Sequence, residues 1–199
     1  MAAVLTGVVP VVPTIFRDDE TVDLDGTVRV VDYLMDAGVD GLCLLANYSE
    51  QFSLDDAERD AFARTLLEHV AGRLPVIVTT SHYSARVAAA RSRAAQDMGA
   101  AMVMIMPPFF GASITANGPA VIEYFQQVAD AIDIPVMVQD APVSSTPMPV
   151  SLLIDLADGC PRCSTPRSRC RRPRTSCRRW SAPSATDCLA RSTARSRSP

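Results

Sequence analysis

Apolar residues in the first 159 positions gather in short runs that alternate with longer amphipathic stretches. The runs are rich in Val, Ile, Leu and Met and are bounded by Gly, Pro or polar residues, which is typical of strands buried on both faces. We predict five such strands, at residues 7–12, 41–45, 75–80, 101–106 and 134–138.

Between the runs, apolar residues recur every three or four positions, the spacing of a helix with one buried face. These stretches cover residues 28–35, 62–70, 87–98 and 121–131, and a fifth begins after Pro149. Gly38, Gly72 and Gly99 stand where the first three helices should end, as C-terminal glycines do. For the second helix we predict Ser53 as the N-cap, with Asp56 reaching back to it.

The strand-helix unit repeats about every thirty residues. Such alternation predicts a parallel sheet covered by helices, because right-handed crossovers lay each helix over the strands it joins. A (β/α)₈ barrel and a doubly wound sheet share this repeat. The glycine-rich turn of dinucleotide-binding folds does not follow the first strand, so we predict an α/β fold that is an incomplete (β/α)₈ TIM barrel of about five units.

The composition changes abruptly at residue 160. Residues 1–159 hold 8 Arg and 21 acidic residues, a net charge of −13, whereas residues 160–199 hold 11 Arg and only Asp187, a net charge of +10. The tail also contains five of the six cysteines, and apolar periodicity of either kind stops there. We therefore predict a barrel domain over 1–159 and a disordered, non-native tail over 160–199.

Two functional interpretations of this tail are weak. Its arginines could bind phosphate backbones, but Trp180 is the only residue there able to stack on bases, so nucleic-acid binding is not favoured. Cys160 and Cys163, with Cys170 and Cys177, match no familiar zinc spacing, so no metal site is expected. Without a leader or a membrane-spanning apolar run we expect a cytoplasmic chain, in which disulfides are not expected either.

Polar and aromatic residues follow the predicted strands at their carboxyl ends, which in α/β folds form the catalytic rim. The segments are 46–50, 81–83, 107–110 and 139–142. Each residue also has a structural interpretation. His82 is more readily a hydrogen-bonded loop residue than a base, Asp140 suits a backbone-held carboxylate or a substrate contact equally, and Phe110 suits a pocket wall.

Several of these segments resemble the dihydrodipicolinate synthase and N-acetylneuraminate lyase family over roughly residues 4–158. The family segments are Gly7–Phe16 with Asp23, Ala37–Gly41, Asn47–Glu50 and Leu54. A second set is similar to one branch, the 2-keto-3-deoxy-L-arabinonate dehydratases: Asn47–Phe52, Thr79–Ser84 and Val138–Pro142.

The resemblance implies Schiff-base chemistry, in which a lysine on strand six condenses with the keto group of a small 2-keto acid. A proton then leaves the neighbouring carbon, and the enamine expels a hydroxyl. It also implies no cofactor and a homotetramer for the intact enzyme. The alternatives are an aldolase of the same family that releases pyruvate, and a non-catalytic binding module with a basic tail.

The same resemblance assigns substrate-binding positions. Tyr48 and Ser49 would hold the substrate carboxylate, with Asn47 beside them, while Gln139 and Asp140 would contact hydroxyls of a sugar-acid chain.

Some positions depart from the best-known members of the family. Gln139 and Phe110 stand where those members carry tyrosines, so His82 becomes the candidate titratable helper. Ser144 replaces the substrate-binding arginine of dihydrodipicolinate synthases, which disfavours that activity.

The chain contains no lysine, and arginine cannot form a Schiff base because its guanidinium stays protonated. A frameshift would explain both this absence and the tail. If the Arg162 codon ends in G, permitted codons for residues 163–177 read Val-Leu-Tyr-Ala-Lys-Val-Glu-Val-Pro-Ala-Ala-Ala-Asp-Lys-Leu in the neighbouring frame. This is a strand that ends in lysine, followed by a helix start. We therefore predict a truncated, out-of-frame dehydratase that is inactive in this form.

Overall fold

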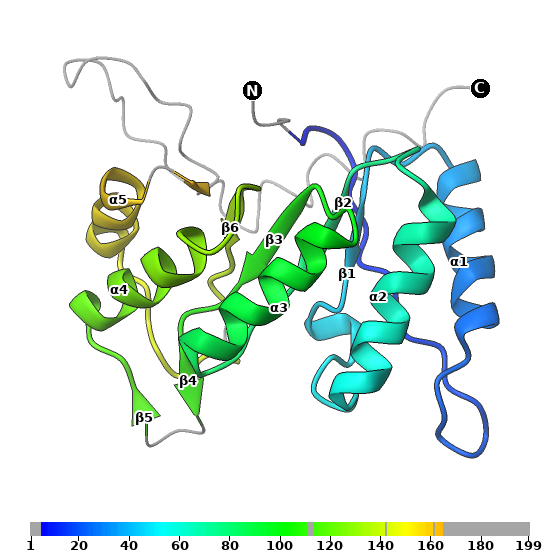
Figure 1. The fold of residues 1–199 in the computed structure, drawn as a ribbon, viewed down its shortest axis with the longest axis horizontal. Coiled ribbons are helices and arrows are strands. Elements are labelled where there is room, and N and C mark those ends of the chain that lie inside the picture. Colours follow the sequence, from blue (N-terminus) through cyan, green and yellow to red (C-terminus); the bar gives the residue numbers. More distant parts are fainter. Residues whose placement is uncertain (1–4, 111–113, 142, 161, 165–199) are drawn as a thin grey trace, which may run out of the picture. The chain divides into compact units, whose positions relative to one another are not determined.

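A parallel sheet forms the centre of the computed structural model, which describes residues 5–110, 114–141, 143–160 and 162–164 (Figure 1). Its strands are β1 (Leu42–Leu44), β2 (Val76–Thr79), β3 (Met102–Ile105), β6 (Val136–Val138) and β7 (Cys163–Ser164). They lie side by side in chain order, and every neighbouring pair is parallel. A separate antiparallel hairpin, β4 (Phe109–Phe110) with β5 (Ile114–Thr115), follows β3 and was not predicted.

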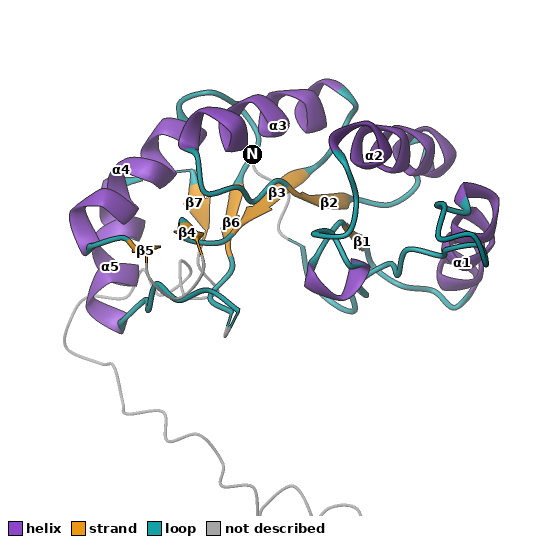
Figure 2. Ribbon diagram, turned by 90° about the horizontal axis from the view of Figure 1, so that it is seen from below, coloured by secondary structure: helices purple, strands orange, loops and turns teal. Residues whose placement is uncertain are grey.

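The helices form a curved layer along one face of the sheet (Figure 2). They are α1 (Leu24–Asp36), α2 (Asp56–Val70), α3 (Ala85–Asp97), α4 (Gly118–Ala129) and α5 (Val150–Gly159), with a single 3₁₀ turn, η1 (Asn47–Ser49), after β1. In a doubly wound sheet the strand order reverses and helices cover both faces, whereas a barrel adds each strand on the same side. The sequential order therefore identifies barrel-type winding.

Alternate residues of each strand belong to two apolar clusters, because side chains of a strand alternate between faces. Leu42, Val78 and Ile105 pack in the larger cluster with helix residues such as Phe62 and Phe125. A smaller cluster lies on the other face and contains Cys43, Ile77, Met102 and Met104. The helix-covered cluster holds the largest buried side chains and so contributes most of the apolar burial.

The first predicted strand, residues 7–12, is not formed as a strand. Val11 makes an isolated parallel bridge to Cys43. The Val12 amide donates to the Cys43 carbonyl, and the Cys43 amide donates to the Pro10 carbonyl, both at 2.9 Å. Pro10 and Pro13 have no amide hydrogen to add to a ladder. The segment therefore lies beside β1 in the first barrel position without regular pairing.

Helix α2 begins at a different cap from the predicted one. Asp55 is the N-cap: its carboxylate accepts from the Glu58 amide at 2.8 Å, and the Glu58 carboxylate accepts from the Asp55 amide at 2.9 Å. Ser53 instead donates its amide to the Glu50 carbonyl in the preceding turn. The predicted Ser53 cap is therefore wrong, because that tight turn delays the helix by two residues.

The predicted helix-ending glycines are confirmed by their backbone angles. Gly38, Gly72 and Gly99 follow α1, α2 and α3 with φ values of +79°, +73° and +95°. These angles lie in the left-handed region that glycine adopts at little cost.

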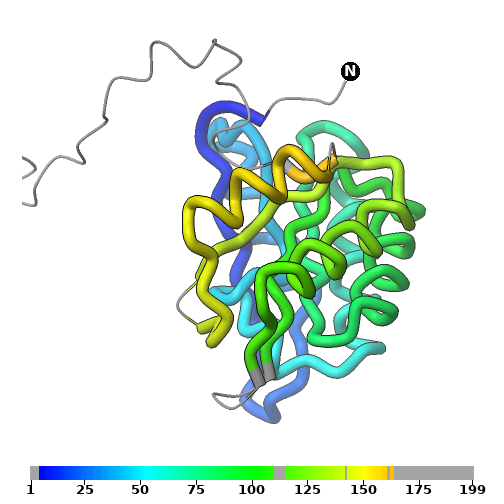
Figure 3. The backbone as a smooth tube through the Cα atoms, turned by 90° about the vertical axis from the view of Figure 1, so that its left-hand side faces the viewer, coloured from blue at the N-terminus to red at the C-terminus, as the bar shows by residue number. Residues whose placement is uncertain are grey.

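The sheet continues past the predicted end of the barrel domain at residue 159. Helix α5 packs against α4, and β7 follows it directly and pairs with β6 (Figure 3). Cys160 and Cys163 form a disulfide, against the expectation that the chain would contain none. The remainder of the predicted tail, from residue 165, lies outside the described residues. Among the helices that are described, none is long and apolar enough to cross a membrane.

Candidate functional site

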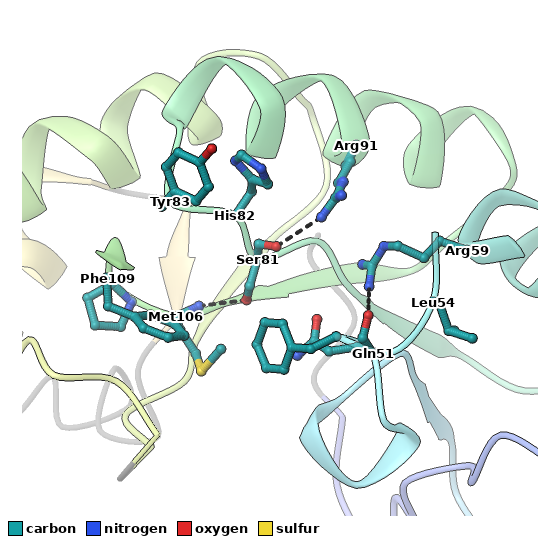
Figure 4. Close-up of a pocket in the computed structure, with 11 residues that line it drawn as sticks. Gln51, Leu54, Arg59, Ser81, His82, Tyr83, Arg91, Met106 and Phe109 are labelled. Atoms are coloured by element: carbon teal, nitrogen blue, oxygen red, sulfur yellow. Dashed lines mark hydrogen bonds between the residues drawn. The ribbon is translucent and has the colours of Figure 1, made fainter. Parts of the chain in front are cut away.

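A cavity of about 320 Å³ opens at the carboxyl ends of β2 and β3, beside the loop that follows β1 (Figure 4). Its size lies at the lower end of the range for small-molecule sites. The lining residues are Gln51, Phe52, Leu54, Arg59, Ser81, His82, Tyr83, Arg91, Met106, Pro107 and Phe109. The cavity thus combines an apolar and aromatic wall with two guanidinium groups and one imidazole.

Arg59 fixes the base of this cavity. It is only 6% exposed, and its guanidinium donates to the Gln51 carbonyl at 3.0 Å and to the Thr79 carbonyl at 3.1 Å. Burial and the neighbouring Arg91 lower its pKa to about 10, so it remains charged at pH 7. Sequence reasoning missed Arg59, although it lies seven residues before Leu66 on the apolar stripe of α2, where a charged residue is unusual.

Arg91 of α3 forms the second cationic group of the wall. It donates to the Ser81 carbonyl at 3.2 Å and forms an ion pair with Asp56 of α2. The hydrogen bond and charge of Arg91 lower the pKa of the Asp56 carboxyl. Arg91 therefore joins the loop after β2 to the start of α2.

Among the predicted site residues whose side chains the structure describes, His82 alone lines the cavity. Its Nδ1 accepts a hydrogen bond from the Ser84 amide at 2.9 Å, and its ring stacks on Tyr83 with centroids 4.3 Å apart. Partial burial, followed by the charge of Arg91, lowers its pKa below the usual 6.5. The neutral ring then carries its proton on Nε2, because Nδ1 is an acceptor. In this conformation His82 is a hydrogen-bond donor at pH 7, and the base of a proton transfer would have to be another group.

The backbone that carries His82 is held from α4. The Tyr124 hydroxyl donates to the His82 carbonyl at 2.7 Å, and burial raises the pKa of that hydroxyl. The Met106 amide donates to the Ser81 hydroxyl at 3.0 Å, which ties the ends of β2 and β3 together. The cavity rim is therefore fixed by packed elements.

The predicted carboxylate-binding residues occupy η1. Tyr48 is 87% exposed, whereas Ser49 is fully buried. The Ser49 hydroxyl donates to the Val12 carbonyl at 2.6 Å and accepts from the Ala46 amide at 3.2 Å, so it anchors the turn to the first segment.

Asn47 connects this turn to the cavity wall. Its Nδ2 lies 3.8 Å from the Met106 sulfur, and its Oδ1 accepts from the Gln51 Nε2 at 2.9 Å. The Gln51 Oε1 is buried and has no hydrogen-bond partner among the described residues. A buried acceptor of this kind favours a ligand that brings a donor, since leaving it unpaired is costly.

Gln139 and Asp140 follow β6, the strand next to β3. The Gln139 backbone amide donates to the Ile105 carbonyl at 2.9 Å, and within the described ranges the buried side-chain Oε1 has no hydrogen-bond partner. Asp140 is exposed, so it is not the buried, backbone-held carboxylate of one interpretation. The Phe110 backbone lies in β4, and its side chain is outside the described residues.

Sequence and structure both relate this chain to known proteins. It is 56% identical over 151 residues to an L-2-keto-3-deoxyarabonate dehydratase of Azospirillum brasilense, covering 76% of this chain and 49% of the relative. It is 38% identical over 158 residues to Escherichia coli K12 YagE, named as a candidate 2-dehydro-3-deoxy-D-gluconate aldolase, covering 77% and 51%. The crystal structure of YagE in complex with pyruvate matches with a TM-score of 0.75 at 35% identity, over 80% of this chain and 53% of YagE.

These matches bear on both fold and family. The chain spans about half the length of the curated relatives it matches. Its sequential parallel sheet matches structures of that family, which confirms the predicted incomplete TIM barrel. The sequence model of the dihydrodipicolinate synthetase family matches residues 4–164, and the chain therefore belongs to the dihydrodipicolinate synthetase family.

Proposed function

We propose that residues 4–164 carry part of a Schiff-base-dependent dehydratase that acts on a 2-keto-3-deoxy sugar acid of the 2-keto-3-deoxy-L-arabinonate type. The observation that carries this proposal is the 56% identity to the Azospirillum brasilense dehydratase. The activity of the whole enzyme remains part of the proposal, because the matched region is 49% of that relative.

The proposed chemistry needs an amine that this chain lacks. A lysine amine condenses with the keto group, the cationic Schiff base accepts electrons, a proton leaves the neighbouring carbon, and the enamine expels a hydroxyl as water. None of the 199 residues is lysine, so we infer that this polypeptide alone does not catalyse the reaction. The part of the reaction that its residues can serve is substrate binding.

The carboxylate end of the substrate is assigned to η1. The Ser49 hydroxyl is engaged by Val12 and Ala46, so Ser49 would position the turn. The Tyr48 hydroxyl, on an exposed side chain, and the Asn47 amide would then be the side-chain donors for the carboxylate.

The hydroxyl-bearing end is assigned to the loop after β6. The unpaired Gln139 Oε1 is an acceptor for a sugar hydroxyl, and the exposed Asp140 carboxylate is a second. His82 would assist as a donor through Nε2, since Nδ1 already accepts from Ser84. The same proposal gives a small 2-keto acid as the substrate and an oligomer as the assembly of the intact enzyme.

A second candidate function is aldol cleavage that releases pyruvate. The similarity to YagE, both in sequence and in its pyruvate-bound structure, favours it. Both reactions share the Schiff base, and they differ in whether the enamine forms by loss of a proton or by carbon-carbon cleavage. The alternative of a nucleic-acid-binding tail concerns residues outside the described part of the chain.

A chimera tests the proposal. Residues 1–158 of this chain would be joined to the part of the Azospirillum brasilense dehydratase that follows its matched region. We expect the chimera to dehydrate 2-keto-3-deoxy-L-arabinonate, detected by mass spectrometry of the product. Pyruvate release, measured with lactate dehydrogenase, would instead support the aldolase. A folded chimera that catalyses neither reaction contradicts the assignment.

Matched glutamine variants of the chimera test the site. Gln139→Met removes the proposed acceptor and should raise KM by about tenfold, the cost of one lost hydrogen bond to a neutral group. Gln127→Met removes an exposed glutamine of α4 that bonds only to Glu123 in the described contacts, and should leave KM unchanged. Equal KM values for the two variants would remove Gln139 from the site.

A further inference from the structure

Cys160 and Cys163 link the end of α5 to the edge of the sheet. Cys160 is the C-cap of α5 and Cys163 opens β7, with Cα atoms 5.3 Å apart and a disulfide between the sulfurs. The Cys163 amide donates to the Cys160 carbonyl at 2.9 Å, which closes a tight turn. Both residues are buried, at 3% and 4% exposure. The hydrogen bond and the Cα separation both bring the end of α5 and the start of β7 within the range that a disulfide spans.

Within the described part of the chain, few other interactions hold β7 in place. It has two residues, and among the described strands it pairs with β6 alone, where the Val136 amide donates to the Arg162 carbonyl at 2.9 Å. The Arg162 guanidinium bonds to the Ala129 and Ile132 carbonyls and pairs with Asp133 at 3.4 Å. A strand of two residues opens readily, so one covalent link at its start changes its local stability considerably.

The position of the pair argues against a catalytic thiol. Redox-active Cys-x-x-Cys pairs sit at helix N-termini, where the dipole favours a thiolate. Cys160 caps a C-terminus, where the helix carbonyls disfavour negative charge. The pair thus suits a structural link that forms and breaks slowly.

We propose that Cys160 and Cys163 are a reversible redox modification site that locks β7 onto β6 when oxidised by a low-molecular-weight disulfide such as glutathione disulfide. One cysteine thiolate attacks the glutathione disulfide and releases one glutathione thiolate, which takes up a proton. The second cysteine thiolate attacks the mixed disulfide and releases the other glutathione. Two cysteine thiols and one glutathione disulfide give one protein disulfide and two glutathione thiols. Because both sulfurs are buried, the exchange proceeds when the edge opens.

The arginine between the two cysteines provides a direct test. Trypsin cleaves after Arg93, Arg162 and Arg167, and the chain has no lysine, so the two cysteines fall on separate peptides, 94–162 and 163–167. Serine would replace the cysteines at the three later positions, Cys170, Cys177 and Cys188. Cys160 and Cys163 can then form a disulfide only with each other or with Cys43. Burial raises the pKa of the Cys43 thiol to about 11, so it serves as an internal unreactive control. The protein is equilibrated with glutathione buffers, acid-quenched, unfolded, alkylated in the unfolded state and digested.

The proposal requires that peptides 94–162 and 163–167 are joined at high glutathione disulfide and separate at high glutathione. The Cys160→Ser and Cys163→Ser variants should give no joined peptides. Absence of the joined peptides at every glutathione ratio, or their persistence at high glutathione, would overturn it.

Amide exchange tests the structural consequence. Reduction should speed exchange of the Val136 amide by about tenfold or more, because the short loop is no longer closed. The control is the Val103 amide of β3, which donates to the Pro135 carbonyl at the edge of β6 that faces away from β7. Its exchange rate should not change. In the Cys163→Ser variant, Val136 should exchange at the fast rate whatever the redox buffer. A Val136 rate that ignores oxidation state in the parent protein would refute the lock.

Discussion

At the residue scale, two arginines from helices supply the positive charges that line the cavity. Arg59 and Arg91 come from α2 and α3, yet both guanidinium groups reach backbone carbonyls at the ends of strands or in the loops beside them. Arg91 also lies close enough to His82 to disfavour its protonated form. The protonation of the imidazole therefore depends on a residue of the following helix as well as on burial.

The titration of His82 checks this dependence. Arg91→Gln should raise the His82 pKa toward 6.5, because it removes the second largest cause of the shift, while the control Arg86→Gln, an exposed residue of the same helix, should leave it unchanged. The measurement is an NMR titration of the imidazole, assigned with a His69→Asn variant. An Arg91→Gln titration that superimposes on the parent curve would contradict the electrostatic account.

The same shift predicts the sign of a pH effect on stability. With a folded-state pKa below 6.5, the unfolded chain binds more protons at His82 than the folded one. The His82 contribution is therefore full above about pH 6.5 and is lost as pH falls through the folded-state pKa. Urea unfolding of the parent and a His82→Asn variant, compared at both ends of this range, measures it.

At the element scale, the start of α2 depends on a reciprocal cap. Asp55 and Glu58 satisfy each other's backbone amides, and Arg91 pairs with Asp56 in the same turn. Because Arg59 lies in the first turn of α2, the cap also sets where its guanidinium enters the cavity.

Substitution separates the observed cap from the predicted one. Asp55→Ala should lower the free energy of unfolding by about 1 kcal/mol, because the Glu58 amide loses its acceptor. Ser53→Ala, the control, should change it by less than about 0.5 kcal/mol, as for an exposed residue that makes no cap. Equal losses in the two variants, measured by urea unfolding, would restore Ser53 as a cap.

At the scale of the whole molecule, the parallel sheet forms without the lysine that Schiff-base chemistry requires. The parallel sheet continues through β7, the position that follows the fifth helix, while the lysine that the family chemistry needs is absent from the sequence. Under the proposed function, this part of the barrel would bind a keto acid at the carboxyl ends of its strands and would form no covalent bond to it.

Borohydride trapping tests whether the chain can form a Schiff base. After incubation with pyruvate and borohydride, the chain should carry no adduct on any side chain, because the α-amino terminus is its only primary amine. A pyruvate-dependent class I aldolase serves as the positive control. Peptide mass spectrometry distinguishes terminal from side-chain modification, and a side-chain adduct would disprove the inferred inactivity.

The local pattern of this sequence determined four of the five predicted strands and the five described α-helices, because apolar spacing and helix-ending glycines act over a few neighbouring residues. The same pattern located the rim with His82. Tertiary structure decided the rest. The proline-flanked first segment pairs only at Val11, the helix cap moves to Asp55, and Arg59 crosses from a helix to two strand-end carbonyls. Each depends on contacts between segments distant in sequence or on the competition between neighbouring turns, which the spacing of apolar residues does not encode.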